Sequence, residues 1–348
     1  MFDSGRVLKQ FAEQAKACDT LGSPFTAGLC RLLAARLDTT TRFGRRVLEW
    51  PGDPYGDNVA LRACGALHAL ARSGWEPSLS TAYPPNDVSE HTLWVAIADA
   101  LAHHDAFLAD RLDSAPQTNE VARSGLILGA MLHVADRTGL PLEIFEIGAS
   151  AGLNLGFDQY GYTLGEGRIW GPADAPLTID IPWRGAVPPL GAGLRVVGHH
   201  GCDLNPLDPG SAADRERLLS YVWADQAHRL QRVDAALKVA AARHQTVDRA
   251  DAAAWLEAKL GAPPTPGVAR VLFHTIVWQY LPAEVKARIE ALLARLGTAA
   301  TPKTPLARFA FEQDATPGSG RMDLTLWPTG ETLTLGRSDF HGRWAEWA

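Results

Sequence analysis

The sequence predicts an α/β fold in which a helical N-terminal region precedes a mostly parallel sheet with helices on both faces. Two observations carry this prediction. Residues 1–140 have apolar residues at helical spacing, whereas short apolar runs alternate with amphipathic segments from Pro141 onward. Strands that alternate with helices form parallel sheets, because each helix returns the chain to the edge where the previous strand began. We therefore expect an N-terminal helical cap domain at 1–140 and an α/β domain at 141–348.

The helical prediction for the first region rests on stripes of apolar residues. Leucines between residues 29 and 37 recur at intervals of three and four, which places them on one face of a helix. Ser23 and Pro24 indicate where this helix begins, with Ser23 as N-cap and Pro24 at the first helical position. The Pro-rich stretch 77–87 is expected to be a loop.

The second region begins with the β-rich run 142–147, a glycine-rich turn and a helical segment at 153–160. The stretch 161–193 is rich in Gly, Pro and Trp and is expected to be an insertion. Pro328-Thr329-Gly330 lies between the two last β-rich runs and predicts an antiparallel hairpin. A mostly parallel seven-stranded sheet closed by such a hairpin is the Rossmann-like architecture of class I methyltransferases. The seven strands are expected at 142–147, 194–203, 245–247, 268–275, 306–312, 322–327 and 332–335.

The turn after the first strand is the candidate nucleotide-binding loop. It carries Glu146, Gly148, Ser150 and Gly152. Glycines permit a tight turn and close backbone approach, and the following helix offers unpaired N–H groups. An acid followed by glycines at alternate positions is typical of loops that bind S-adenosylmethionine, with Ser150 here replacing the middle glycine. The alternative is a turn that only packs a helix on a strand.

Two aspartates occupy the positions expected for contacts with the nucleoside. Asp203 ends the second predicted strand and is the candidate ligand of the ribose hydroxyls. Asp180 is its competitor, and a turn or Asx-cap role is the alternative for Asp203. Asp251 follows the third predicted strand and is the candidate partner of the adenine amine. Its alternative role is the N-cap of the next helix.

The fourth predicted strand ends in residues suited to an acceptor pocket. His274 is a candidate general base, because an imidazole titrates near neutral pH. The alternative is a hydrogen-bonded core histidine. Trp278 and Tyr280 are candidate walls of the pocket, or else core aromatics.

A run of polar side chains before the helix at 119–138 forms a second candidate acceptor site. Gln117, Asn119 and Glu120 are expected to fold over the cofactor as a lid, with Glu120 as an alternative proton acceptor. Arg123 lies one turn further and is expected to pair with Glu120 or with a substrate carboxylate. Capping of the helix by Thr118 or Asn119 is the simpler alternative.

Composition and charge exclude several classes of partner. The net charge is −6 and there is no basic block, so no nucleic acid partner is expected. No run approaches the ~20 apolar residues of a membrane span. The four cysteines form no CxxC pair and the N-terminus has no signal-peptide core, which favours a cytoplasmic protein with reduced thiols. No metal site is expected, since His199, His200 and Cys202 are too close in sequence to converge on one ion and no second cluster exists.

Taken together, these segments are similar to a bacterial family called domain of unknown function 2332, over nearly the whole chain. The family is uncharacterised and is regarded as similar to S-adenosylmethionine-dependent methyltransferases. That similarity lies in the strand, loop and helix of 142–160. The segments that carry the resemblance are PQTNEVARS (116–124), EIGASAGLNLGFDQYGY (146–162), WGPADAPL and WRG, GCDLNPLDP (201–209), YVWADQAHRLQRVDAAL (221–237), VLFHTIVWQYLP (271–282) and the final LTLWPTGE and HGRW.

The resemblance and the loop together predict a methyltransferase that uses S-adenosylmethionine and acts on an unknown small-molecule acceptor. Catalysis would consist chiefly of positioning the acceptor in line with the methyl group. Two other functions stay open. One is a non-catalytic nucleotide- or cofactor-binding protein on the same fold, and the other is an NAD-dependent oxidoreductase. Binding of S-adenosylmethionine or of NAD separates them, whereas the fold alone does not.

Overall fold

The computed structural model describes residues 3–348 and contains two compact units. Unit 1 comprises the chain up to Thr118 together with Ala212–Asp234, and unit 2 comprises Asn119–Ser211 together with Ala235–Ala348. The sequence-based boundary at residue 140 falls inside unit 2, between helix α7 (Ser124–Thr138) and strand β1 (Leu142–Ile147). The last of the three boundaries between the units, after Asp234, falls within helix α9 (Ala227–Ala242).

Unit 1 is built from helices. The predicted leucine stripe is confirmed, since Leu29, Leu32 and Leu33 are buried in the core of this unit. The expectation of a plain loop at 77–87 is wrong, because Pro77 begins a short helix whose Leu79 is buried. The helices are α1 (Ser4–Thr20), α2 (Pro24–Arg36), α3 (Arg42–Leu48), α4 (Val59–Ser73), α5 (Pro77–Ala82), α6 (Glu90–Arg111) and α8 (Ala212–Ser220).

The segment 212–234 joins unit 1 through side-chain hydrogen bonds to helices α2 and α4. Helix α2 begins at Pro24 as predicted, but the carboxylate of Asp225 caps it. Asp225 Oδ2 accepts a hydrogen bond from the backbone N–H of Phe25 at 2.9 Å, and Oδ1 accepts one from Ser23 Oγ at 2.5 Å. The ring of His68, on α4, contacts the carbonyl oxygen of Ser220 through Nδ1 at 3.0 Å. A residue about 200 positions away thus supplies the cap.

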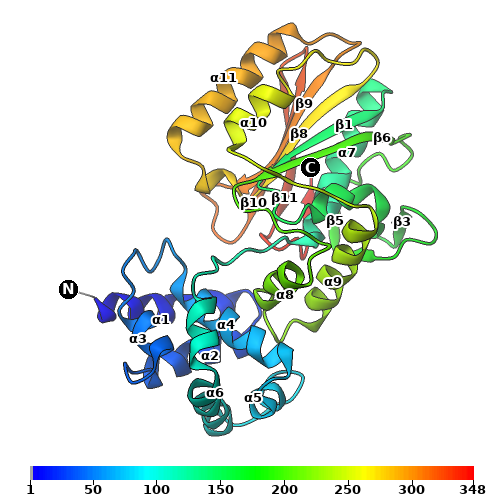
Figure 1. Ribbon diagram of the computed structural model, residues 1–348. Coiled ribbons are helices and arrows are strands. Elements are labelled where there is room, and N and C mark those ends of the chain that lie inside the picture. The colour runs from blue at the N-terminus through cyan, green and yellow to red at the C-terminus, as the bar shows by residue number, and fades with distance from the viewer. Residues whose placement is uncertain (1–2) are drawn as a thin grey trace. The chain divides into compact units, whose positions relative to one another are not determined.

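Unit 2 contains a nine-stranded sheet in the order β5-β12-β11-β10-β9-β8-β1-β6-β7 (Figure 1). Five neighbouring strands, β7, β6, β1, β8 and β9, are parallel to one another. Strand β10 pairs antiparallel with β9, and β10 and β11 form the predicted antiparallel hairpin. Their bounds are β1 (Leu142–Ile147), β5 (Trp183–Gly185), β6 (Val196–Asp203), β7 (Asp248–Arg249), β8 (Ala269–Thr275), β9 (Leu306–Gln313), β10 (Gly320–Trp327), β11 (Glu331–Ser338) and β12 (Ala345–Trp347).

The expected seven strands are therefore wrong in number, and the third is displaced. The C-terminal β12 pairs with β11, and β5 from the insertion pairs with β12 through Ala345 and Trp183. Three-residue strands such as these give no periodic signal in the sequence. The third strand lies at 248–249 instead of 245–247.

Helices cover both faces of the sheet in unit 2. Helices α10 (Ala252–Lys259) and α11 (Ala283–Ala299) pack on the face to which Phe145 and Ile147 of β1 contribute. Helix α7 contacts β8, β9 and β10 and lies on the other face (Figure 1). Every residue of β8 is buried, as expected for a central parallel strand.

The insertion forms a separate three-stranded sheet in the order β3-β2-β4. Strands β2 (Gly161–Leu164) and β3 (Arg168–Trp170) make a hairpin, and β4 (Thr178–Asp180) pairs in parallel with β2. Tyr162 is fully buried and donates a hydrogen bond from its hydroxyl to the Phe157 carbonyl at 2.7 Å, which fixes the insertion to the preceding segment. Across residues 3–348, no helix combines the length and the apolar character that a membrane span requires.

Two helix-interior glycines of unit 1 provide a matched test of the packing of segment 212–234. A Cβ built on Gly65 would lie 2.5 Å from Cε1 of Tyr221, whereas one built on Gly28 has no atom within 4 Å. We expect Gly65→Ala to lower the free energy of unfolding by roughly 1–3 kcal/mol through overpacking. Gly28→Ala should raise it by about 0.5–1 kcal/mol, because alanine is the better helix former. Thermal unfolding measures both, and equal gains in stability would contradict the packing of Tyr221 on α4.

Candidate functional site

The loop after β1 turns sharply through three residues with left-handed backbone. Gly148, Ser150 and Gly152 have φ values of 69°, 55° and 69°. A Cβ on Gly148 would overlap the side chain of Val277, and one on Gly152 would lie 3.0 Å from Cγ2 of Val247. Both glycines are therefore required by packing within the chain itself. Ser150 adopts a conformation that is uncommon for a residue with a Cβ, and such positions are concentrated at functional sites.

The helical segment expected at 153–160 is a 3₁₀ helix, η2 (Leu153–Gln159). Side chains form hydrogen bonds with the backbone N–H and carbonyl groups of its first residue, Leu153. Asn119 Oδ1 accepts a hydrogen bond from the Leu153 N–H at 2.9 Å, and the Tyr160 hydroxyl donates to the Leu153 carbonyl at 2.7 Å. Because η2 is a short 3₁₀ helix whose first N–H is already bonded, its N-terminus offers little to an anion.

Asp203 stands at the end of β6 and is tied to the loop. Its Oδ2 accepts a hydrogen bond from the Ser150 N–H at 2.9 Å, and Oδ1 accepts one from the Asn205 N–H at 2.8 Å. Each carboxylate oxygen can accept a second hydrogen bond, so Asp203 can still bind two hydroxyl groups. The competing residue, Asp180, lies on β4 in the three-stranded sheet and is exposed.

Glu146, at the end of β1, is 2 % exposed. Burial, followed by the negative charge of Asp203, raises the pKa of its carboxyl group well above the usual range. Among the described residues, neither Glu146 Oε2 nor the Ser150 hydroxyl has a hydrogen-bond partner, although both atoms are buried. Unsatisfied buried polar atoms are uncommon in folded proteins, so these two, one at the end of β1 and one in the loop after it, make this a candidate position for a ligand.

Polar residues at and just before the start of α7 hold the segment η2 that follows the loop. Ser124 Oγ donates to Asn154 Oδ1 at 2.8 Å, and Asn119 holds η2 as described above. Glu120 is buried and caps the short 3₁₀ helix η1 (Val121–Arg123), where its Oε1 accepts from the Ala122 N–H at 3.3 Å. Of the predicted acceptor residues, Asn119 and Glu120 thus lie in unit 2, whereas Gln117 belongs to unit 1.

Arg123 joins the end of β8 to the C-terminal segment. Its Nε donates to the Phe340 carbonyl at 2.8 Å and its Nη1 donates to the Thr275 carbonyl at 3.2 Å. Asp339 is buried and accepts a hydrogen bond from the Arg343 N–H at 2.6 Å, which shapes this C-terminal turn. The sequence prediction placed no site residue there. The available signal was an aspartate four residues before an arginine, around Gly342.

His274, at the end of β8, has both ring nitrogens engaged. Nδ1 lies 2.6 Å from Glu312 Oε1, and Nε2 accepts a hydrogen bond from Arg308 Nε at 3.1 Å. Burial lowers the pKa of the His274 imidazole, whose side chain is fully buried. In this geometry the ring has no nitrogen available to accept a proton from a substrate. Glu312 was missed by the sequence analysis, although a carboxylate near the end of an apolar strand is a usable signal.

The two predicted pocket aromatics differ in environment. The Trp278 ring stacks on His274 with a centroid distance of 5.1 Å, and the Arg308 guanidinium lies 4.5 Å from its centroid. Tyr280 is 72 % exposed. Trp278 is therefore part of the buried His274 cluster, whereas Tyr280 has a free face for a ligand.

Asp251 follows β7 and is the N-cap of α10, which is the alternative role that the sequence analysis gave it. Its Oδ1 accepts a hydrogen bond from the Ala254 N–H at 3.0 Å, and it lies 3.6 Å from Nη1 of Arg288. Contact with an adenine amine stays a prediction. Across residues 3–348, no three His, Cys, Asp or Glu side chains are grouped so as to hold a metal ion, and the four cysteines are free and buried.

Comparison with known proteins identifies a family but no characterised relative. Residues 8–347 match the model of a family described as "Uncharacterized protein conserved in bacteria (DUF2332)". No curated protein and no solved structure matches the chain. The geometry of the site must therefore carry the functional argument.

The raised pKa of Glu146 predicts a pH-dependent effect of Glu146→Gln. An acid whose pKa is raised by folding stabilises the protein below its unfolded-state pKa, and this contribution is lost as the pH rises toward the folded-state pKa. The uncharged glutamine does not titrate, so the melting temperature of the variant relative to wild type should rise from roughly pH 5 to pH 8.

Asp314→Asn is the control with the opposite sign. Hydrogen bonds from Arg337 lower the pKa of the Asp314 carboxyl, so the wild type gains stability as this group ionises. The deficit of the Asp314→Asn variant should therefore grow as the pH rises through the acid range. A constant offset between Glu146→Gln and wild type at every pH would show that Glu146 titrates normally.

Proposed function

The chain belongs to the bacterial DUF2332 family, and we propose that it is an S-adenosylmethionine-dependent methyltransferase acting on a small-molecule acceptor. One observation carries the proposal. The loop after β1 meets the acid at the end of β6, through the hydrogen bond from the Ser150 N–H to Asp203 Oδ2. This pairing of a tight loop with a strand-end carboxylate is the arrangement that holds a nucleoside on a parallel sheet.

Strand order supports the same location. The chain runs from β1 to β6 on one side and later to β8 on the other, so the strand order reverses at β1. Loops at such a reversal diverge to opposite faces and leave a crevice beyond the carboxyl ends of the strands, where ligands bind. The proposal thus includes a Rossmann-like methyltransferase core, with β5 and β12 added at the far edge.

The unsatisfied atoms of the loop suggest how the ligand would be held. Asp203 retains lone pairs for the two ribose hydroxyls, and Ser150 Oγ is unbonded at the turn. The raised pKa of Glu146 favours its protonated form, which can donate a hydrogen bond to a ligand instead of repelling a neighbouring carboxylate. An uncharged acid behind the loop also avoids placing a second negative charge next to Asp203.

Bound S-adenosylmethionine would supply an electrophilic methyl group. The residues of this chain would bind and orient the acceptor and exclude water, because methyl transfer depends chiefly on alignment. Arg123 and the C-terminal turn at Asp339 would close the site beside Thr275. His274 has no role as a base in this proposal, since both of its nitrogens are bonded, and Glu120 is the remaining candidate proton acceptor.

The engagement of His274 favours one second candidate. Without a general base to deprotonate an acceptor, the protein would bind an adenosyl compound in the same crevice but would not transfer its methyl group. Binding with no turnover on any acceptor supports that function. An NAD-dependent oxidoreductase, the third expectation, is tested in the same binding experiment.

We expect Asp203→Ala to weaken the binding of S-adenosylhomocysteine by ~1.5–3 kcal/mol, as for charge-assisted hydrogen bonds, which is about 10-fold to 150-fold in affinity. Isothermal titration calorimetry measures the change. Asp180→Ala is the matched control, because Asp180 is the competing carboxylate and is exposed. It should bind like wild type.

Three outcomes would overturn parts of the proposal. Loss of binding in Asp180→Ala but not in Asp203→Ala would move the ribose site to the insertion. Tight binding of NAD with no binding of S-adenosylhomocysteine would replace the methyltransferase with an oxidoreductase. Absence of binding of either compound by the wild type would end both enzyme proposals.

A further inference from the structure

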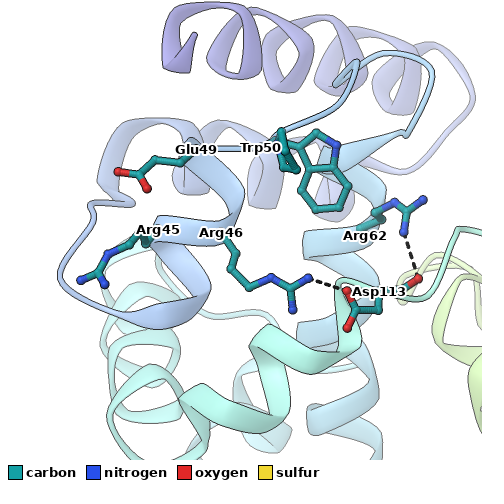
Figure 2. A pocket seen from close by; sticks show the side chains of 7 residues that line it. Arg45, Arg46, Glu49, Trp50, Arg62 and Asp113 are labelled. Carbon is teal, nitrogen blue, oxygen red and sulfur yellow. Dashed lines mark hydrogen bonds and ion pairs between the residues drawn. The ribbon is translucent and has the colours of Figure 1, made fainter. Parts of the chain in front are cut away.

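Unit 1 contains a pocket that plays no part in the proposed function. It has a volume of about 510 Å³, within the ~300–1,000 Å³ of small-molecule sites. Helix α3, the residues that follow it, helix α4 and the segment after α6 form its walls (Figure 2). The lining residues are Arg45, Arg46, Glu49, Trp50, Pro51, Arg62 and Asp113.

Bonds to the backbone hold the two inner arginines in place. Arg46 Nη1 donates to the Ala109 carbonyl at 2.7 Å, and Arg62 Nη1 donates to the Leu112 carbonyl at 2.9 Å. Figure 2 shows the guanidinium of Arg46 turned toward Asp113, with which it forms an ion pair. Both cations therefore occupy fixed positions at the end of α6 before any ligand arrives, which reduces the entropy lost on binding.

Trp50 gives the pocket a flat apolar wall. Its indole Nε1 donates to Asp57 Oδ2 at 2.8 Å, which fixes the ring, and the Arg62 guanidinium lies 5.2 Å from the ring centroid. A ring held in this way, beside a stacked guanidinium, suits a planar ligand.

The charge of the pocket favours an anion. The lining contains three arginines and two carboxylates, Glu49 and Asp113, which leaves one net positive charge. Hydrogen bonding to Arg46 lowers the pKa of the Asp113 carboxyl, so the ion pair is maintained at neutral pH. Within residues 3–348, Arg62 Nη2, Arg46 Nε, and Arg45 Nε and Nη1 make no hydrogen bond, so N–H groups of three cations are available to a ligand.

We propose that this pocket binds a small planar organic anion, meaning a flat ring that carries a carboxylate or phosphate group. The ring lies against Trp50 and Pro51, and the anionic group meets Arg45 and the unbonded N–H groups of Arg46 and Arg62. Arginine suits both anions, because its planar fork matches their oxygen atoms. The site belongs to unit 1 alone and does not depend on the function proposed for unit 2.

The experiment follows the indole N–H resonance of Trp50 in the full-length ¹⁵N-labelled protein, assigned by its absence in Trp50→Phe. The probes are adenosine monophosphate and 4-hydroxybenzoate, which separate phosphate from carboxylate as the anionic group. Adenosine and inorganic phosphate test the ring and the anion separately. We expect at least one ring-bearing anion to shift this resonance saturably below about 5 mM, and adenosine and phosphate alone to act more weakly.

Arg45 supplies the decisive variants, because it is exposed and makes only one hydrogen bond, to the Thr39 carbonyl. Arg45→Gln should weaken binding roughly fivefold to tenfold, and Arg45→Glu should abolish it at the same probe concentrations. Arg42→Gln and Arg42→Glu are the matched controls, because Arg42 is an exposed arginine on the same helix that does not line the pocket. They should leave binding within about twofold, since Arg42 pairs with Asp110 and does not line the pocket, and its charge is exposed to screening by salt.

Two results would overturn the proposal. One is the absence of any shift of the Trp50 resonance with all four probes. The other is an equal loss of binding in the Arg42 and Arg45 variants, which would indicate a diffuse charge effect. Asp203→Ala should leave this titration unchanged, so that failure of the unit 2 proposal and failure of this one are distinguishable.

Discussion

Strand β1 is hydrogen-bonded along both edges, to β6 and to β8, and this central position constrains the rest of unit 2. A strand buried on both faces has to leave the sheet through a tight turn, because helices already cover the space above and below it. The left-handed residues of the loop make that turn. The end of β6 lies beside it, so Asp203 meets the loop as a direct consequence of parallel pairing.

The same constraint explains the state of Glu146. Its side chain is buried in the interior of unit 2, away from water, and the neighbouring Asp203 carries a negative charge. An ionised carboxylate is costly in such a place, whereas a protonated one is tolerated. The fold therefore favours the uncharged form of Glu146 next to the candidate loop, which a solvent-exposed loop would not do.

Contacts from distant parts of the chain complete both units. In unit 2, Arg123 binds the carbonyl groups of Thr275 and Phe340 and so fastens the C-terminal turn to the end of β8. In unit 1, Asp225 caps α2, and Arg46 and Arg62 occupy carbonyl groups at the end of α6. In each case a charged side chain satisfies backbone groups that a helix or strand leaves unpaired at its end.

The sequence by itself determined the helical first region, the strands 142–147 and 268–275 and the closing hairpin, whereas the contact between the glycine loop and Asp203 was found only in the tertiary structure. Long apolar runs and turn residues report local structure and burial directly. Only the tertiary structure decided that both nitrogens of His274 are bonded, that Gly148 and Gly152 are packed against Val277 and Val247, and that β5 and β12 extend the sheet. These features depend on contacts between residues that are far apart in the sequence, and the spacing of residues along the chain does not predict such contacts.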